Sequence, residues 1–214
     1  MIPLSDEKRA GKFPFITVSL ILINIFVFFF TFSNLDFYIQ KYGFIPKEIE
    51  GGRRIYTFIS SLFIHASISH LIGNLWFLWV FGDNVEARIG KIKFLILYFL
   101  SGFGSLILFS LTTSDKTIPV VGASGAISGI LGAYLILFPR NRIRALVPGF
   151  YFYRIVSISA LFYIGIWFLY QFLYISVDPF VAYWGHIGGF LTGILLIKIL
   201  QNKKSRKNYV SAKF

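Results

Sequence analysis

The chain alternates long runs of apolar residues with short polar or basic segments. A transmembrane helix needs roughly 20 consecutive, mostly apolar residues. Six stretches approach this length: Phe15–Phe32, Ser69–Val85, Phe94–Thr112, Ser124–Phe138, Ile155–Val177 and Phe180–Leu200. Polar or small residues interrupt the second and the fourth, but the distribution of charge along the chain requires both. The pattern therefore predicts an all-α, polytopic membrane protein built as a six-helix bundle.

The composition is that of a membrane protein rather than a soluble domain. Hydrophobic residues make up 56% of the 214 residues, more than a soluble domain of this size needs for its core. No linker-like segment divides the chain, so we expect a membrane domain over residues 13–200, a cytoplasmic segment before it (1–12) and a basic cytoplasmic tail after it (201–214). Cysteine is absent, which excludes a disulfide framework, a thiolate nucleophile and a cysteine metal site.

The net charge of +12 fits membrane orientation better than nucleic-acid binding. With both termini inside, 16 of the 21 Lys and Arg residues fall on inner segments and span ends: Lys8, Arg9, Lys12, Arg88, Lys91, Lys93, Arg140, Arg142, Arg144, Arg154, Lys198, Lys203, Lys204, Arg206, Lys207 and Lys213. The other 5 fall outside: Lys41, Lys47, Arg53, Arg54 and Lys116. Because inner loops carry the excess of Lys and Arg, we expect a multi-pass protein of a cell membrane with both termini cytoplasmic.

The first outer connection, Ser33–Ile68, is both long and apolar. Irregular backbone exposed to lipid would leave its polar groups without hydrogen bonds. We therefore expect this loop to pack against the bundle or to lie in the outer leaflet.

Polar side chains inside spans are costly and mark functional sites. Eight occur in spans or at their ends: Asn24, His70, Asn74, Glu86, Ser124, Ser128, Gln171 and His186. Three of them, His70, Ser124 and His186, lie near the start of spans that enter the membrane from outside. Their common depth predicts one shared site in the outer part of the membrane.

Ser124 and His186 both lie among glycines. Glycines beside Ser124 allow a tight turn, and the free N–H groups of a helix start stabilise a developing negative charge. A helix N-cap on a small-residue packing face would give the same local pattern. Gly185, Gly189 and Gly193 form a stripe on one helix face, and two small-residue stripes would let the helices pack closely. Such packing would bring His186 to Ser124, although a histidine that only bonds between helices would also fit.

His70 and Asn74 are four residues apart, so both project from one helix face and could donate to one oxygen. No acid lies near the histidines in sequence and no His-Glu-x-x-His motif occurs, so we expect neither a metal nor another cofactor. The aspartates after Asp6 lie in loops or at span ends, which excludes an aspartyl pair within spans. Among hydrolytic mechanisms, only the serine–histidine mechanism has its parts here.

Four motifs follow one another in the chain: His65-Ala-Ser-Ile-Ser-His70-Leu-Ile-Gly-Asn74, Gly82-Asp-Asn-Val-Glu86-Ala-Arg88-Ile-Gly90, Gly122-Ala-Ser124-Gly125 and Gly185-His186-Ile-Gly188-Gly189. Together they resemble the rhomboid family of intramembrane serine proteases over nearly the whole chain. The resemblance implies a six-helix bundle with a Ser–His dyad and no acidic third member. It also implies cleavage of membrane-anchored substrates, single-span or other membrane proteins, within or near their spans.

Carried over by position, Ser124 is the nucleophile and His186 its general base, later the acid for the leaving amine. The backbone N–H of Ser124 and the side chains of His70 and Asn74 would form the oxyanion hole. Each donor of this kind is typically worth about 3–4 kcal/mol of barrier.

The resemblance also assigns structural residues and reveals departures. Glu86 resembles the family's structural glutamate, which braces the first long loop, and we expect Gly122, Gly125 and Gly189 to be structural. Family members often carry an aromatic residue one turn after the serine, against which the histidine packs. Ser128 occupies that position here, which leaves open what orients the histidine.

Two other functions fit a small polytopic protein. A catalytically inactive relative would bind membrane proteins without cleaving them, but such relatives usually lose the serine or a histidine. A small transporter would use Asn24 and Gln171 to line a path across the membrane, whereas the polar groups concentrate near one face.

Overall fold

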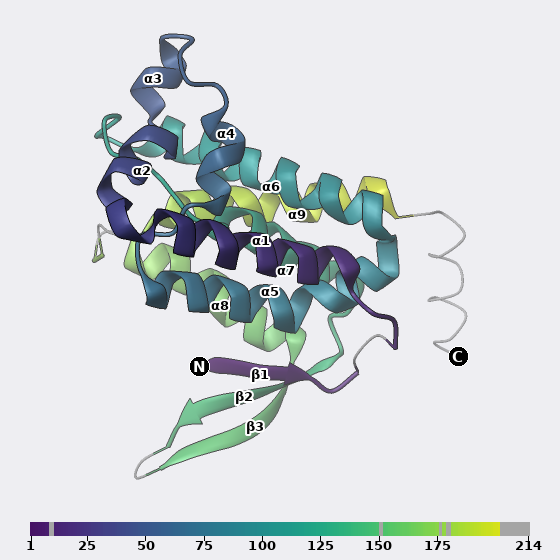
Figure 1. The fold of residues 1–214 in the computed structure, drawn as a ribbon. Helices are drawn as coiled ribbons and strands as arrows, with labels where there is room; N and C mark the ends of the chain where they lie inside the picture. The colour runs from purple at the N-terminus through teal and green to yellow at the C-terminus, as the bar shows by residue number, and fades with distance from the viewer. Residues whose placement is uncertain (9–10, 150–151, 176, 179–180, 202–214) are drawn as a thin grey trace.

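A computed structural model of the protein describes residues 1–8, 11–149, 152–175, 177–178 and 181–201. Six longer helices in this part of the chain pack side by side as a bundle (Figure 1). They are α1 (Phe15–Thr31), α5 (Ile68–Ile89), α6 (Lys91–Thr112), α7 (Ser124–Leu137), α8 (Ala160–Tyr174) and α9 (Tyr183–Leu200). Each overlaps one of the six predicted apolar stretches. The predicted start of the last stretch, at residue 180, and all of the tail after residue 201 lie outside the described residues.

Not every helix is long enough to cross a membrane. Phe15–Tyr42, α6 and α9 qualify by length and composition, and a fourth span results if Thr57–Phe63 and α5, bent by 96° at their junction, count as one. Helices α7 and α8 have 14 and 15 residues, so they extend only about 21–23 Å. A bilayer core is about 30 Å thick. The described residues thus contain three or four helices that are long and apolar enough to cross a membrane, as a multi-pass helical protein requires, and the six spans stay a prediction.

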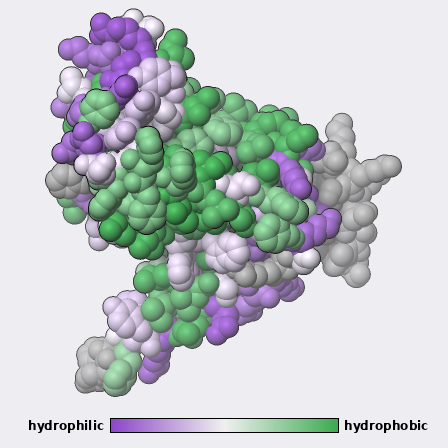
Figure 2. Space-filling model, in the orientation of Figure 1, coloured by the Kyte–Doolittle hydropathy of each residue, from purple (hydrophilic) through white to green (hydrophobic). Residues whose placement is uncertain are grey.

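The surface of the bundle is suited to lipid. Figure 2 shows hydrophobic side chains spread over the helices, while hydrophilic ones gather over the first loop and on the sheet below the bundle. Large apolar residues face outward on several helices, including Phe26 and Phe29 on α1, Leu111 on α6, Leu173 on α8 and Ile199 on α9. Because these outward-facing side chains are apolar, they are suited to contact with the hydrocarbon of a membrane rather than with water.

Local sequence signals set several helix boundaries. The Ser67 hydroxyl caps α5 by accepting a hydrogen bond from the His70 N–H, at 3.1 Å. Ser159 caps α8 in the same way. Gly90, with φ of +85°, lies between α5 and α6, a backbone conformation that favours glycine. This turn makes α5 and α6 antiparallel neighbours.

A three-stranded antiparallel sheet lies beside the bundle (Figure 1), so the all-α prediction is wrong for these segments. Its strands are β1 (Ile2–Asp6), β2 (Arg142–Pro148) and β3 (Tyr153–Ser159), in the order β1-β2-β3. Strand β3 takes the first five residues of the predicted span Ile155–Val177. Hydropathy measures composition and not periodicity, and the β-branched, alternating sequence of β3 favours a strand over a helix.

Asp6 anchors the sheet to the bundle. It is 4% exposed and accepts hydrogen bonds from Asn84 of α5, Tyr134 of α7 and Asn141 before β2. A buried carboxylate is stable only when its oxygens are satisfied in this way. At the other end of β1, the Trp76 indole donates to the Pro3 carbonyl. The N-terminal segment is therefore packed along α5.

Glu86 of α5 caps the start of α1. Its carboxylate accepts from the Ile16 N–H at 2.9 Å, and from the Thr17 N–H and hydroxyl at 2.8 Å each. Pro14, the residue before α1, provides no side-chain cap. A carboxylate at a helix N-terminus satisfies free N–H groups and the helix dipole. The expectation that Glu86 braces the first loop is therefore wrong, because its partners lie at the opposite end of α1.

The first loop is folded rather than irregular. It contains η1 (Phe32–Asn34), α2 (Leu35–Tyr42), α3 (Pro46–Glu50), α4 (Thr57–Ser60) and η2 (Ser61–Phe63). As expected, part of its apolar surface packs inward: Phe44, Leu62 and Ile64 are buried. Phe44 also pairs with Val120 through two backbone hydrogen bonds of 2.8 and 2.9 Å. This pairing connects the loop to the segment that leads into α7.

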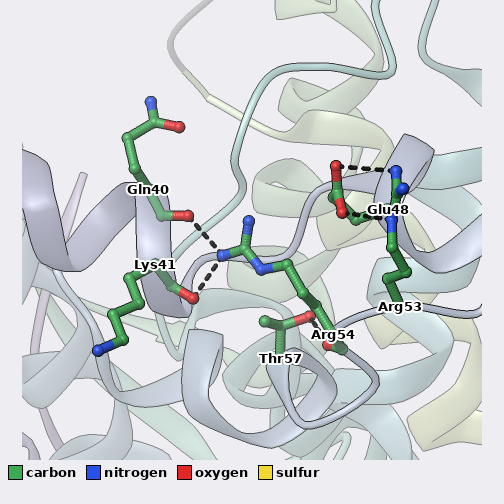
Figure 3. Close-up of polar contacts among 6 residues, drawn as sticks. All are labelled: Gln40, Lys41, Glu48, Arg53, Arg54 and Thr57. Atoms are coloured by element: carbon green, nitrogen blue, oxygen red, sulfur yellow. Dashed lines mark hydrogen bonds and ion pairs between the residues drawn. The ribbon is translucent and has the colours of Figure 1, made fainter.

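Figure 3 shows how two neighbouring arginines hold this loop. The guanidinium of Arg54 donates to the carbonyls of Gln40 and Lys41 at the end of α2. That contact satisfies carbonyls that have no partner within the helix. Arg53 instead pairs with Glu48 at 2.9 Å, and its side chain is largely exposed.

Candidate active site

Ser124 is the first residue of α7 and is half-buried. Two residues earlier, Gly122 has φ of +114°, a conformation open to glycine but strained for other residues. The Gly122 N–H donates to the Ser61 carbonyl at 2.8 Å, which ties this turn to the first loop. The helix start has no side-chain cap. The first-turn N–H groups, including that of Ser124, therefore have no carbonyl partner within α7.

Helices α7 and α9 pack backbone to backbone through glycines. A Cβ atom built on Gly189 would lie 2.0 Å from the Gly125 carbonyl oxygen, and one on Gly193 would lie 2.0 Å from that of Gly129. These are two of the small-residue positions predicted on each helix. Both pairs have the same offset in sequence, so the helices run parallel in one register. Only glycine permits so close an approach.

This register places His186 near the start of α7. The sequence offset that pairs the glycines of the two helices also pairs His186 with Gly122. Two residues of helical rise, about 3 Å along the helix axis, therefore separate the level of His186 from that of Ser124. Helix α6 packs against the starts of both α7 and α9, because its Ser105 side chain contacts Gly125 and Gly185. The predicted meeting of these two helix starts is thus present in the fold.

His70 lies against the turn that precedes Ser124. A Cβ atom on Gly122 would lie 2.7 Å from Nε2 of the His70 ring. His70 therefore lies at the turn that leads into Ser124.

Asn74 and His65 surround His70. Asn74 is 6% exposed, and its amide donates to the His70 carbonyl at 2.8 Å. Asparagine has two amide hydrogens, so a second donor remains. His65 is fully buried, and its ring packs edge-on against His70 with centroids 5.1 Å apart. The ring of His65 thus packs against the His70 imidazole, while Asn74 holds the His70 backbone.

The surroundings of His186 come mainly from α8. Its Nδ1 lies 2.8 Å from the Gln171 side-chain oxygen. The rings of Trp167 and Tyr183 flank it, with centroids at 6.2 and 6.1 Å. One face of His186 borders a cavity of about 380 Å³ that Met1, Gln171 and Tyr183 also line. The cavity is large enough for several water molecules.

In the described part of the chain, no group of three or more His, Asp, Glu or Cys side chains is arranged to hold a metal ion. The chemistry available at this end of the bundle is that of a hydroxyl, imidazoles and amides. A hydroxyl and an imidazole are the groups that nucleophilic catalysis by serine requires.

Comparison with known proteins gives the family. Residues 52–203 match the family model described as the Rhomboid domain. The chain is 34% identical over 166 residues to RHOMBOID-like protein 6, mitochondrial, of Arabidopsis thaliana, covering 76% of this chain and 49% of that protein. It is 31% identical over 147 residues to Rhomboid-like protease 3 of Toxoplasma gondii, covering 67% of this chain and 51% of that protein.

The chain belongs to the rhomboid family. A third relative, Rhomboid protein 1, mitochondrial, of Saccharomyces cerevisiae, is 33% identical over 111 residues, which are 50% of this chain and 31% of that protein. The chain thus spans about half or less of the length of these relatives.

This rhomboid orients its histidine by residues that its motifs do not contain. The Ser128 hydroxyl donates to the Ser124 carbonyl at 2.7 Å, as a helical serine often does. The aromatic contacts to His186 come from Trp167 and Tyr183 instead. Gln171 could be noticed in the sequence as a polar residue within a span, but its partner could not, because 15 residues of chain separate it from His186.

Proposed function

We propose that this rhomboid is an intramembrane serine endopeptidase that uses Ser124 as nucleophile and His186 as general base. The observation that carries the proposal is the register of α7 and α9, which sets His186 level with the turn that precedes Ser124. Family membership supports the reaction class, and the retention of both residues favours an active enzyme over an inactive binder.

The proposed reaction follows from the groups at this end of the bundle. The Ser124 hydroxyl attacks the carbonyl carbon of the substrate's peptide bond while His186 takes the hydroxyl proton. The tetrahedral oxyanion would accept hydrogen bonds from the Ser124 N–H, the His70 ring and the free amide hydrogen of Asn74. His186 then returns the proton to the leaving amine, and an ester to Ser124 remains.

Hydrolysis of that ester requires water at His186. The cavity beside His186 supplies room for it. Water gives a proton to the imidazole and attacks the ester, which releases the new carboxylate and restores the serine. No step needs a metal or another cofactor.

The proposed substrates are single-span or other membrane proteins, entering sideways between α5 and α8. Helix α8 contacts its neighbouring helices at far fewer places than α6, α7 and α9 contact one another. The start of β1 lies at this place, since Tyr163 of α8 donates to the Met1 carbonyl at 3.2 Å and Trp76 of α5 to that of Pro3. The absence of cysteine makes a test simple. Cross-linking α5 to α8 through introduced cysteines should block cleavage of a membrane substrate, and unchanged cleavage would exclude this path.

We further propose that the protein lies in a cell membrane with both termini cytoplasmic. The excess of Lys and Arg on the inner segments supports this orientation. The start of α6 and the end of α9 lie together, since Lys93 donates to the Leu200 carbonyl at 2.8 Å. In that orientation the site opens toward the outer side. Labelling of cysteines introduced in the first loop and at the N-terminus with an impermeant reagent distinguishes the two sides.

A fluorophosphonate probe tests the nucleophile on purified protein in detergent. Labelling should occur in the wild type, vanish in Ser124→Ala and fall strongly in His186→Ala. A matched control is Ser128→Ala, because that hydroxyl only bonds to the Ser124 carbonyl. Folded wild type that takes no label, or a Ser124→Ala variant labelled like the wild type, would overturn the proposal.

A further inference from the structure

Gln171 has both ends of its amide engaged at a buried position. It is 2% exposed, in the last turn of α8. Its nitrogen donates to the Trp167 carbonyl at 2.7 Å, and its oxygen lies 2.8 Å from Nδ1 of His186. A polar side chain placed so deeply in a lipid-facing helix has a large desolvation cost, which these two bonds offset.

The Trp167 carbonyl fixes which way this amide points. A carbonyl oxygen can only accept a hydrogen bond, so the group that faces it must be the NH₂ of Gln171. The oxygen of Gln171 therefore faces His186. That oxygen can also only accept, so Nδ1 of His186 must carry the proton. In a neutral imidazole the lone pair is then on Nε2, the nitrogen on the other side of the ring.

We propose that Gln171 is the positioning residue of the dyad: it holds His186 in the tautomer with the proton on Nδ1, which leaves Nε2 as the base for Ser124. This inference rests on the proposed function for its catalytic meaning. The tautomer itself follows from the hydrogen bonds alone. The dyad then has a third member from α8, a neutral amide in the place where soluble serine hydrolases carry a carboxylate.

The aromatic neighbours complete the positioning. The ring of Trp167 is inclined by 32° to the plane of the His186 imidazole. The ring of Tyr183 is nearly edge-on to it, at 79°. They restrict rotation of the ring, while the amide selects its tautomer. Position 128 cannot do either, because Ser128 bonds to the backbone of its own helix.

The amide also keeps this end of the bundle free of added charge. The other ionisable groups on residues that line the cavity are the amino terminus at Met1, Tyr163 and Tyr170 from α8, and Tyr183 from α9. Among the described residues that line the cavity, none is a carboxylate. A glutamate at position 171 would accept the same hydrogen bond from the Nδ1–H of His186. Its carboxylate, however, would be a charge in apolar surroundings, which costs free energy.

The tautomer can be observed directly, whether or not a substrate is at hand. The chain has three histidines, so ¹⁵N-histidine labelling gives three imidazole signal sets, and His186 is assigned by its loss in His186→Gln. The wild type should carry its proton on Nδ1 of His186. In Gln171→Met, which keeps the side-chain length but has no acceptor, this preference should be lost. Gln171→Glu should restore it.

Kinetics supply the second readout. Gln171→Met should lower kcat strongly with KM nearly unchanged, because a histidine in the wrong tautomer cannot act as the base, and Gln171→Glu should recover part of the loss. Asn24→Leu is the matched control. Asn24 is another fully buried amide whose nitrogen bonds to a carbonyl four residues earlier, but it lies on α1. A purely structural effect would appear in both variants.

Each result decides the question. A proton on Nε2 of His186 in the wild type, or a Gln171→Met variant that keeps both tautomer and kcat, would overturn the inference. If Gln171→Met does not fold, the wild-type and Gln171→Glu spectra still answer it. If the wild type shows the Nδ1 proton but no Ser124-dependent cleavage, the proposed function fails while the role of Gln171 in fixing the tautomer stands.

Discussion

The imidazole of His70 lies so close to Gly122 that a Cβ atom there would be 2.7 Å from its Nε2. The glycine belongs to the turn before the nucleophile, and the histidine belongs to the proposed oxyanion hole. The contact therefore fixes the distance between two parts of the site that come from different helices.

Replacing Gly122 by alanine should displace His70 and impair the site. Alanine at φ of +114° adds backbone strain of about 1–3 kcal/mol, and its methyl group overlaps the imidazole. We expect the fluorophosphonate labelling rate to fall about 10-fold or more, as misplacement near a reacting centre does. Gly52→Ala is the control, because Gly52 also has a positive φ, +70°, but nothing lies within 4 Å. Equal rates in the two variants would show that the contact with His70 has no effect.

Replacing Gly189 by alanine should push α9 away from α7. The added methyl group would meet the Gly125 carbonyl oxygen at 2.0 Å, and overpacking of this kind typically destabilises by about 1–3 kcal/mol. Gly165→Ala on α8 meets nothing within 4 Å, so better helix propensity should stabilise it by about 0.5–1 kcal/mol. Unfolding in mixed micelles measures both. A stable Gly189→Ala variant would contradict the backbone-to-backbone packing.

Loss of the Glu86 carboxylate should loosen the start of α1. Glu86→Gln leaves one acceptor oxygen where the carboxylate has two that accept three hydrogen bonds, and an unsatisfied buried donor costs about 1–3 kcal/mol. Hydrogen exchange at the amides of Ile16 and Thr17 should accelerate. Glu50→Gln removes an exposed partner of Lys116, for which the usual effect is about 0–1 kcal/mol. The account would be wrong if the two variants lost the same stability.

The two arginines of the first loop should differ in their effect. Arg54→Ala removes a cap from the carbonyls of Gln40 and Lys41, so α2 should fray. Limited proteolysis within the first loop should then become faster. Arg53→Ala removes only an exposed pair with Glu48 and should leave the proteolysis rate unchanged. Faster cleavage in Arg53→Ala than in Arg54→Ala would reverse this assignment.

The sequence predicted where the helices are better than how far each extends through the membrane. Apolar runs located all six longer helices, with α7 correct to one residue at its end. The sheet was missed because β3 and α8 form one uninterrupted apolar run, and hydropathy does not distinguish strand from helix within it. Strand β1 depends on pairing with residues about 140 positions later, at Leu146 and Ala145. No local pattern reports such a contact.

The close packing of α7 and α9 was predictable because both carry a stripe of small residues, and the structure shows the glycines of the two helices in contact. The shared site of His70, Ser124 and His186 stays a prediction from their common depth. The contacts of Glu86 and Gln171 were not predictable, since each bonds to another helix. The sequence marked both as polar groups in need of a partner, but only the fold identifies that partner.

Cleavage of a membrane substrate tests the central claim most directly. The purified protein and a single-span substrate would be reconstituted in liposomes, and the products analysed by mass spectrometry. Wild type should produce fragments cut within or near the substrate's span, while Ser124→Ala and His186→Ala, folded equally well, should produce none. Fragments formed at the same rate by Ser124→Ala would contradict Ser124 as the nucleophile.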